Sequence, residues 1–170
     1  NNVNWNVTSI RDHSFWKCAS LTSITIPDSV TSIGEYAFSE CTSLKSITIP
    51  DSVTSIENHT FFGCSSLESV TIPDSVKIIK YAAFSSCSSL ESVTIGKGVT
   101  SIGDYAFNVC TKLTSITIPD NVNSIESNAF SGCSSLKSVT IDSPMIAGLR
   151  SSNSKLLDNA TKVYVISGLT

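Results

Sequence analysis

One eleven-residue segment recurs along this 170-residue chain at a fixed interval of 23 residues. The segment SITIPDSVTSI occupies residues 23–33, returns unchanged at residues 46–56, and has close copies beginning at residues 69, 92 and 115. Phenylalanine, cysteine and leucine keep the same register, each in one column: Phe15, Phe38, Phe61, Phe84, Phe107, Phe130; Cys18, Cys41, Cys64, Cys87, Cys110, Cys133; Leu21, Leu44, Leu67, Leu90, Leu113, Leu136. A fixed period in this range is typical of solenoids, in which each repeat packs only against its neighbours. The period therefore predicts a stack of similar coils.

The first part of each repeat has the pattern of a half-buried strand. In the copy at residues 23–26, apolar Ile24 and Ile26 alternate with polar Ser23 and Thr25. Alternation of this kind, with β-branched residues, favours a strand that has one face in the core. The Pro-Asp pair that follows ends the strand, because proline fixes φ and has no N–H to donate.

The rest of the repeat is predicted to form a second extended stretch and a helical turn. Val30 and Ile33 are the apolar positions of the extended stretch. Ala37, Phe38 and Cys41 then follow at a spacing that suits a single turn of α- or 3₁₀-helix. Since neighbouring strands lie about 4.8 Å apart, each column of like residues becomes a ladder in the stack. The predicted fold class is thus an α/β repeat.

The repeat resembles a known family. Its pattern, C-x-x-L-x-x-[IV]-x-I-P-x-x-V-x-x-I-x-x-x-A-F-x-x-C, covers residues 3–141 and is similar to the BspA-like class of leucine-rich repeats. The resemblance implies a right-handed leucine-rich-repeat solenoid, with a short strand, a short extended stretch and an α/3₁₀ turn in each 23-residue coil. It also implies a secreted or cell-surface protein of host-associated microbes that acts in adhesion or protein binding. Gly96-Lys97-Gly98 replaces Pro-Asp-Ser in one copy without changing the length of the repeat.

The chain is expected to comprise a repeat array at residues 1–141 and a C-terminal capping segment at residues 142–170. The array opens inside a partial first repeat, which about six units follow, so we expect a piece of a longer protein. In the tail, Asn153–Ala160 is predicted to form a short helix and Lys162–Ile166 a strand that together close the last coil. At the other end, Trp5 and Trp16 are the residues expected to cover the first coil.

Composition and motifs argue against several classes of function. The net charge of −3 does not suit a nucleic-acid partner, which needs a surplus of Lys and Arg on one face. No apolar run reaches the roughly 20 residues of a membrane helix, and the first ten residues do not form a signal peptide. His13 and His59 share a column two coils apart, about 10 Å, too far for a catalytic dyad. No catalytic or phosphate-binding motif is present, so neither enzyme activity nor a cofactor is predicted.

The cysteine and aspartate columns each have a structural interpretation. Buried free cysteines behave as small hydrophobic residues, and the cysteine column lies beside the Phe and Leu columns, so we predict reduced core thiols. Disulfides between neighbouring cysteines remain the alternative; a metal site is disfavoured because there is no C-x-x-C. One column of aspartates suggests a calcium site, but each aspartate is expected to serve its own turn, because Lys97 interrupts the row: Asp28, Asp51, Asp74, Asp120.

The outward side chains of the main strand are the candidate binding surface. They form two columns of hydroxyl residues on the side that is concave in leucine-rich repeats: Ser23, Ser46, Ser69, Ser92, Ser115, Ser138 and Thr25, Thr48, Thr71, Thr94, Thr117, Thr140. Small hydroxyl and β-branched residues also stack well for purely structural reasons, so both interpretations stay open. No Trp, Tyr or Arg anchor lies in these columns, which favours weak, multivalent contact.

Two variable columns could carry specificity or could be solvated edges. One includes the charged residues Lys45, Glu68, Glu91 and Lys137. The other comprises Arg11, Gly34, Glu57, Lys80, Gly103 and Glu126, and its mixture of residues indicates that no positive φ is required there. Neighbours of opposite sign, Lys45–Glu68 and Glu57–Lys80, are predicted to pair across coils.

These features together predict a non-enzymatic adhesion or binding module that recognises an extracellular protein or glycan. The alternative is a passive structural stalk that spaces other domains from a cell surface. An ordered-water or ice-binding surface is a third possibility, but Ser-x-Thr rows on a concave face fit it poorly. Three N-x-T sequons, at Asn6, Asn58 and Asn159, matter only if the source glycosylates secreted chains.

Overall fold

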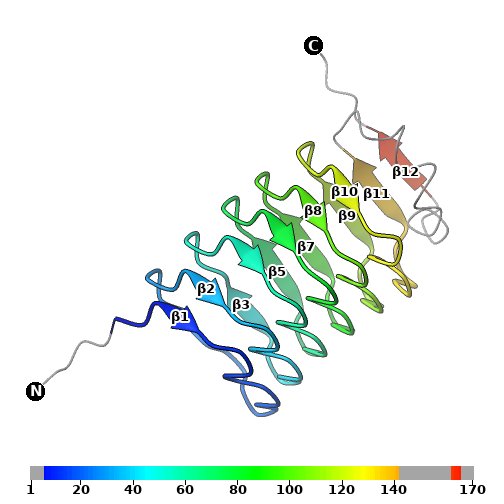
Figure 1. Cartoon of the computed structure of the whole chain (residues 1–170). Coiled ribbons are helices and arrows are strands. Elements are labelled where there is room, and N and C mark those ends of the chain that lie inside the picture. The colour runs from blue at the N-terminus through cyan, green and yellow to red at the C-terminus, as the bar shows by residue number, and fades with distance from the viewer. Residues whose placement is uncertain (1–5, 142–161, 166–170) are drawn as a thin grey trace, which may run out of the picture.

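The protein is a solenoid in which successive coils of the chain stack along one axis. The computed structural model describes residues 6–141 and 162–165, and Figure 1 shows the coils following one another in chain order. Most neighbouring coils are joined by parallel strand pairs, and the interior of each coil is filled by the apolar columns of the repeat. The stack is therefore the repeat solenoid that the period predicts, with the right hand that the family resemblance implies.

The strands form two strips on opposite sides of the stack, and each strip consists of two parallel sheets, with a break between β7 and β9 in one strip and between β2 and β4 in the other. The first strip contains β3 (Ser46–Thr48), β5 (Ser69–Ile72), β7 (Ser92–Ile95), β9 (Ser115–Ile118), β11 (Ser138–Ile141) and β12 (Lys162–Val165). The second strip contains β1 (Ser9–Ile10), β2 (Ser32–Ile33), β4 (Ser55–Ile56), β6 (Ile78–Ile79), β8 (Ser101–Ile102) and β10 (Ser124–Ile125). The second, shorter strip is the extended stretch that the sequence predicts in each repeat.

The register of the strands keeps like residues on top of one another. Within the array, every strand pair joins residues 23 positions apart, such as Ser69 with Ser92 and Ile79 with Ile102. β12 extends the first strip beyond the array, with Ser138 opposite Lys162. A shift of one residue would turn the inward side chains outward, so the period fixes the register.

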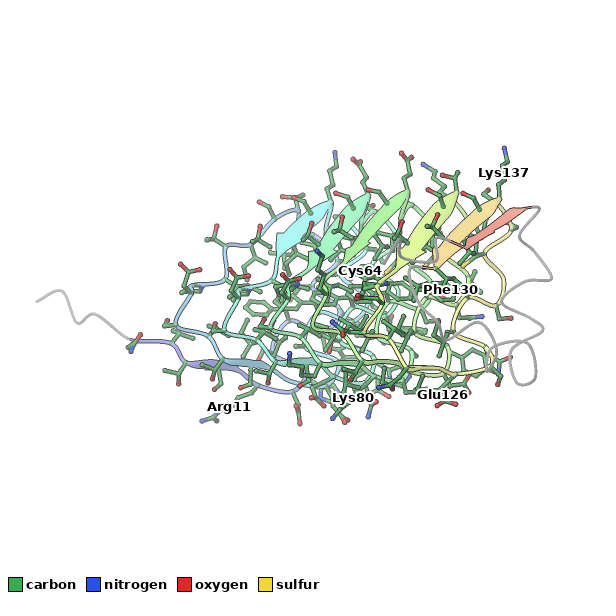
Figure 2. All side chains as sticks on the ribbon, turned by 90° about the horizontal axis from the view of Figure 1, so that it is seen from above. Arg11, Cys64, Lys80, Glu126, Phe130 and Lys137 are labelled. Carbon is green, nitrogen blue, oxygen red and sulfur yellow. The ribbon has the colours of Figure 1, made fainter. Side chains whose placement is uncertain are left out.

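The core lies between the two strips and is built around a stack of phenylalanine rings. Phe15, Phe38, Phe61, Phe84, Phe107 and Phe130 stack with ring centroids 5.0–5.5 Å apart and interplanar angles of 2–11°. Figure 2 shows Phe130 and Cys64 between the strips. The Val, Ile, Leu, Ala and Cys columns surround the rings and are buried in the inner coils. The column spacing that the sequence predicts is thus confirmed by the ring separations.

The predicted α/3₁₀ turn is wrong: the segment between the strips forms a series of turns, and the described residues contain no helix. Alternate backbone N–H groups in this segment donate to the next coil, as in Phe61 N–H to Ala83 O (2.8 Å). The N–H groups that lie between them form turns within the same coil, as in Phe62 N–H to His59 O (3.1 Å). A helix needs successive N–H groups to bond along one axis. Left-handed residues interrupt that pattern twice in most coils, at φ values of 51–74°.

Among residues 6–141, the left-handed positions hold glycine only twice, at Gly63 and Gly132. The equivalent residues in other coils include Val109, at φ 56°, which is a strained conformation for a β-branched side chain. The hydrogen bonds to the neighbouring coil compensate for this strain in the folded stack.

Other expectations about the ends are corrected or lie outside the described residues. The strand expected at Ser23–Ile26 does not form, and this part of the first coil is joined to the next by the bond from Lys45 N–H to Thr22 O (3.2 Å). The tail strand expected at Lys162–Ile166 is present as β12. The helix expected at Asn153–Ala160, most of the capping segment, Trp5 and Asn159 lie outside the described residues.

The cysteine column forms a ladder of thiol hydrogen bonds. All six cysteines are free, and five are buried, Cys18 of the first coil being exposed. Each buried thiol donates to the carbonyl of the phenylalanine 26 residues earlier, at 3.1–3.3 Å: Cys41 to Phe15, Cys64 to Phe38, Cys87 to Phe61, Cys110 to Phe84, Cys133 to Phe107. Burial raises the pKa of the Cys41 thiol to about 11 and that of Cys87 to about 12, which keeps both protonated as donors.

Candidate binding surfaces

The first strip presents the two hydroxyl columns outward, and we call these twelve residues the Ser/Thr face. Ten of them are exposed; Ser138 and Thr140, in the last coil of the array, are half-buried. The strands place them outward because side chains alternate, so that Ile47, Val70 and their counterparts fill the core instead.

The hydroxyls of the Ser/Thr face take no part in the contacts between coils. None of its twelve side chains makes a hydrogen bond within the described chain. Serines in the turn after the first strip behave differently: Ser52 Oγ donates to Val30 O (2.6 Å) and Ser75 Oγ to Val53 O (2.6 Å). The chain thus uses one serine column to join its coils and leaves the other exposed.

Two depressions lie along one margin of the Ser/Thr face. The larger, about 400 Å³, is lined by Ser46, Ile47, Thr48, Ile49, Asp51, Ser69, Val70, Thr71 and Pro73. The smaller, about 190 Å³, lies further along the stack and is lined by Ile95, Lys97, Thr117, Pro119 and Asp120. Each combines a threonine, a proline and an exposed aspartate from the turn after the strand. The margin therefore offers carboxylate acceptors beside the hydroxyls.

The edge column beside the Ser/Thr face is exposed, but its expected pairing does not form. Lys45 and Glu68 are joined only through the backbone, from Glu68 N–H to Lys45 O (3.1 Å). Glu91 instead pairs with Lys112 (3.4 Å), which belongs to a different column, and Lys137 projects outward at the end of the row. Exposed pairs of this kind contribute little to stability, so the column stays available as a solvated, charged margin.

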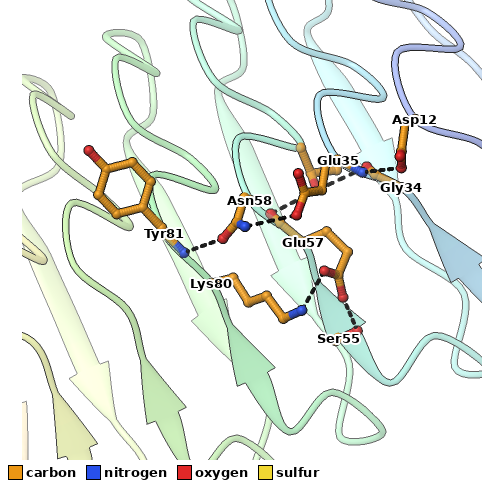
Figure 3. Close-up of polar contacts among 9 residues, drawn as sticks. Asp12, Gly34, Glu35, Ser55, Glu57, Asn58, Lys80 and Tyr81 are labelled. Carbon is orange, nitrogen blue, oxygen red and sulfur yellow. Dashed lines mark hydrogen bonds and ion pairs between the residues drawn. The ribbon is translucent and has the colours of Figure 1, made fainter.

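The second predicted ion pair is present on the opposite strip. Lys80 Nζ lies 2.5 Å from Glu57 Oε2, and Ser55 Oγ donates to the other carboxylate oxygen of Glu57 (2.7 Å). Figure 3 shows this group of contacts on the second strip. The column to which Glu57 and Lys80 belong is thus held in place by contacts between coils.

The column that directly follows the column of Glu57 and Lys80 also joins neighbouring coils through its side chains. The sequence analysis did not predict these contacts. Asp12 accepts from Glu35 N–H (2.8 Å), and Asn58 accepts from Tyr81 N–H (3.2 Å) while donating to Glu35 Oε1 (2.8 Å). These contacts also appear in Figure 3. The recurrence of Asp or Asn in this column, with Asp104 in the same role, was the signal that could have revealed them.

The two histidines stack with tyrosine and do not form a catalytic pair. Tyr36 lies between them, with ring centroids 4.9 Å from His13 and 4.5 Å from His59. His59 is half-buried, and its Nδ1 has no hydrogen-bond partner among the residues that the structure describes. Burial lowers the pKa of its imidazole, although Glu35 opposes the shift.

Stability is expected to fall when the pH is lowered through the titration range of His59. The unfolded chain, with the ordinary histidine pKa near 6.5, takes up a proton before the folded chain does. The contribution of neutral His59 to the free energy of unfolding is therefore fully present above that pH, and it declines as the pH falls toward the lower pKa of the folded state. Melting temperatures measured from about pH 7.5 to pH 5 should show a smaller decline in His59→Tyr, which places a third tyrosine where Tyr36 and Tyr105 already stand. His13→Tyr is the control that keeps His59, and equal declines in both variants would contradict the assignment.

No reactive or metal-binding cluster is found among the described residues. No group of three or more His, Cys, Asp or Glu in residues 6–141 could hold a metal ion. The aspartates after the first strip are exposed, and Asp74 accepts from Lys97 N–H of the next coil (2.7 Å), so this aspartate joins two coils, whereas the sequence predicted that it would serve its own turn. Within the same described part, no helix has the length and apolarity that crossing a membrane requires.

The 23-residue coils, with their parallel strands and buried Leu, Phe and Cys columns, are those of a leucine-rich-repeat solenoid. The family model for the BspA type leucine rich repeat region matches in six copies over residues 8–137, and the chain belongs to this family. Leucine-rich-repeat solenoids are typically protein-interaction repeats and not enzymes. No functionally curated protein matches the chain.

Solved bacterial proteins share the architecture. A leucine-rich cell surface protein from Faecalibacterium prausnitzii A2-165 is 29% identical, with a TM-score of 0.64, and the match covers 95% of this chain and 52% of that one. A leucine-rich repeat protein from Eubacterium ventriosum is 33% identical over 74% of this chain and 34% of its own, with a TM-score of 0.68. The pneumococcal vaccine antigen PcpA, at 21% identity, 96% and 42% coverage and a TM-score of 0.72, shows the shared fold alone. The chain spans about half the length of the Faecalibacterium protein.

Proposed function

We propose that the chain is a non-enzymatic adhesion module of a secreted or cell-surface protein that binds an extracellular protein or glycan through the Ser/Thr face. The observation that carries this proposal is the row of exposed hydroxyls without partners inside the described part of the chain. Membership of the leucine-rich-repeat family and the similarity to a cell surface protein support the location.

The chemistry of the face favours weak, repeated contacts. Serine and threonine hydroxyls both donate and accept hydrogen bonds but offer little apolar area for an anchor. Similar groups recur from coil to coil, so an extended or repetitive ligand can engage several at once and gain avidity. The exposed edge residues Lys45, Glu68, Glu91 and Lys137 would adjust specificity at the margin.

The test is surface binding of the purified chain to a panel of matrix proteins, mucins and glycans. The double variant Ser92→Arg/Thr94→Arg should abolish saturable binding, because two long charged side chains would cover the centre of the face. A matched control, Thr42→Arg/Ser134→Arg, adds the same charge at exposed turn positions and should bind normally. Circular dichroism verifies that both variants fold.

A passive stalk is the second candidate, and the same experiment separates the two. Binding that survives in the Ser92→Arg/Thr94→Arg variant would move recognition away from the Ser/Thr face. No saturable binding to any member of the panel would support the stalk, which needs only the regular stack of coils.

A further inference from the structure

The charges that follow the second strip have a regular order. Each two-residue strand of this strip is followed by one residue of a single column, which we call the charged column: Arg11, Gly34, Glu57, Lys80, Gly103, Glu126. Read along the stack, its order is cation, glycine, anion, cation, glycine, anion. Figure 2 shows Arg11, Lys80 and Glu126 projecting on the same side of the molecule, opposite to Lys137.

This order is complementary to its own reverse. If a second copy is laid on the strip with its stack running in the opposite direction, Arg11 faces Glu126 and Glu57 faces Lys80. The two glycines, Gly34 and Gly103, face each other. A two-fold axis between the third and fourth coils of the column therefore places every charge opposite its counterion, as an isologous interface requires. A parallel, in-register arrangement would instead place Arg11 opposite Arg11.

The glycines leave gaps in the charged column, so no side chains of this column separate the two copies where Gly34 and Gly103 face each other. A depression of about 580 Å³ is lined by Ser9, Ile10, Arg11, Asp12, Ser32, Ile33, Gly34 and Glu57. A Cβ at Gly34 would lie 2.3 Å from Asp12 Oδ1, and one at Gly103 would lie 2.9 Å from the carbonyl carbon of Lys80. Close approach of the preceding coil thus excludes side chains at both positions and keeps the gaps open.

The centre of the same strip carries an exposed apolar residue. Ile78 is 41% exposed, whereas the equivalent position holds serine in the other coils: Ser9, Ser32, Ser55, Ser101, Ser124. Ile78 lies in the coil of Lys80, directly beside the position of the two-fold axis. The isoleucines of two copies would therefore meet near the middle of the interface. Tyr81, 46% exposed, is in the same coil.

We propose that two copies of this chain pair through the second strip, antiparallel, with the ion pairs Arg11–Glu126 at both ends and Glu57–Lys80 at the centre. Glu57 and Lys80 already pair within each chain, so at the two-fold axis two such pairs meet head to tail and each charge also faces its counterion in the other copy. The end residues Arg11 and Glu126 are both exposed and form no ion pair with another described residue. The Ser/Thr face lies on the opposite strip, so the pair exposes two such faces pointing away from each other. This inference does not depend on the proposed function.

The interface is small, so the dimer is expected to be weak and sensitive to salt. Six coils at about 4.8 Å per step give a column roughly 24 Å long. Interfaces at the low end of the size range form transient complexes. Exposed ion pairs are screened when the Debye length falls from about 30 Å at 0.01 M salt to about 3 Å at 1 M.

Sedimentation of the whole 170-residue chain over a range of concentrations and two ionic strengths tests the proposal. The wild-type chain should dimerise at roughly 0.01 M salt and be monomeric at about 1 M. Arg11→Glu and Glu126→Arg should each weaken the dimer at least about tenfold, a loss of about 1.4 kcal/mol. An equimolar mixture of the two variants should restore it as a heterodimer, because the glutamate introduced in one copy then faces the arginine introduced in the other.

Two further variants complete the design. The charge-reversed double variant Arg11→Glu/Glu126→Arg should dimerise with itself, whereas Ile78→Ser should be monomeric with unchanged thermal stability, because serine occupies this column elsewhere. A wild-type chain that stays monomeric at low salt would overturn the proposal. So would single charge variants that dimerise as the wild type does, or a mixture that fails to recover the dimer.

Discussion

Replacing Phe84 with alanine is expected to lower the free energy of unfolding by about 3–5 kcal/mol. The ring is fully buried and stacks on Phe61 and Phe107, with centroids 5.0 and 5.3 Å away. Its removal leaves a gap in the middle of the ring stack, which neighbouring coils cannot close without breaking their register. The loss should be measured by chemical denaturation monitored by circular dichroism.

The matched control for Phe84→Ala is Phe62→Ser. Phe62 is half-buried and contacts the edge of His59, and serine already occupies this position in other coils, at Ser39 and Ser85. Its replacement should change stability by less than about 1 kcal/mol, as substitutions away from the core usually do. Equal losses in the two variants would show that the ring stack does not carry the stability assigned to it.

Deletion of residues 69–91 is expected to leave a folded, shorter solenoid. The cut removes one whole repeat and joins Glu68 to Ser92, which recreates the local sequence SLESVTI found at both sites. Every column then continues across the junction, so β3 pairs with β7 as it now pairs with β5. Circular dichroism should show the wild-type signal per residue, with a cooperative but lower melting transition, because one interface between coils has been lost.

Deletion of residues 69–90, which is shorter by one residue, is expected to prevent a single folded stack. The columns on the two sides of the junction are then out of phase, and a shift of one residue turns the strand's inward side chains outward. We expect a loss of cooperative unfolding and greater sensitivity to proteolysis than in the deletion of the whole repeat. Equal stability of the two deletions would contradict the claim that the period fixes the register.

The columns of the sequence predicted the strips, the register and the core, because identical residues at a fixed interval leave one way to stack. The helical turn could not be excluded in the same way. Ala37, Phe38 and Cys41 have a spacing that both a helix and a series of turns can direct inward. The two structures differ in the acceptors of alternate backbone N–H groups. In this chain those groups donate to carbonyls of the adjacent coil, which excludes the helix.

The thiol hydrogen bonds show a similar limit. Burial and the free state of the cysteines follow from their place beside Phe and Leu, as the structure confirms for five of the six. The acceptor, a phenylalanine carbonyl 26 residues earlier, depends on how far one coil is offset from the next. Neither the spacing nor the composition contains that offset.

The outward position of the Ser/Thr face was predictable from alternation along a strand, and the structure has the expected exposure. The edge pairing was only half predictable. Glu57 and Lys80 meet because they lie side by side after paired strands, whereas Lys45 and Glu68 sit before the strands, where the backbones alone are joined. What the face binds remains a proposal, since hydroxyl columns specify a kind of contact and not a partner.

The hydrogen bonds between strands and turns run along the stack, from each coil to the next, and this decides how the molecule should respond to tension. A force applied to the two ends of the chain acts on these bonds one interface at a time. Each coil that peels away releases 23 residues, up to about 76 Å of extended chain, while the others keep their contacts. We therefore expect the array to lengthen in equal steps and to yield gradually under load.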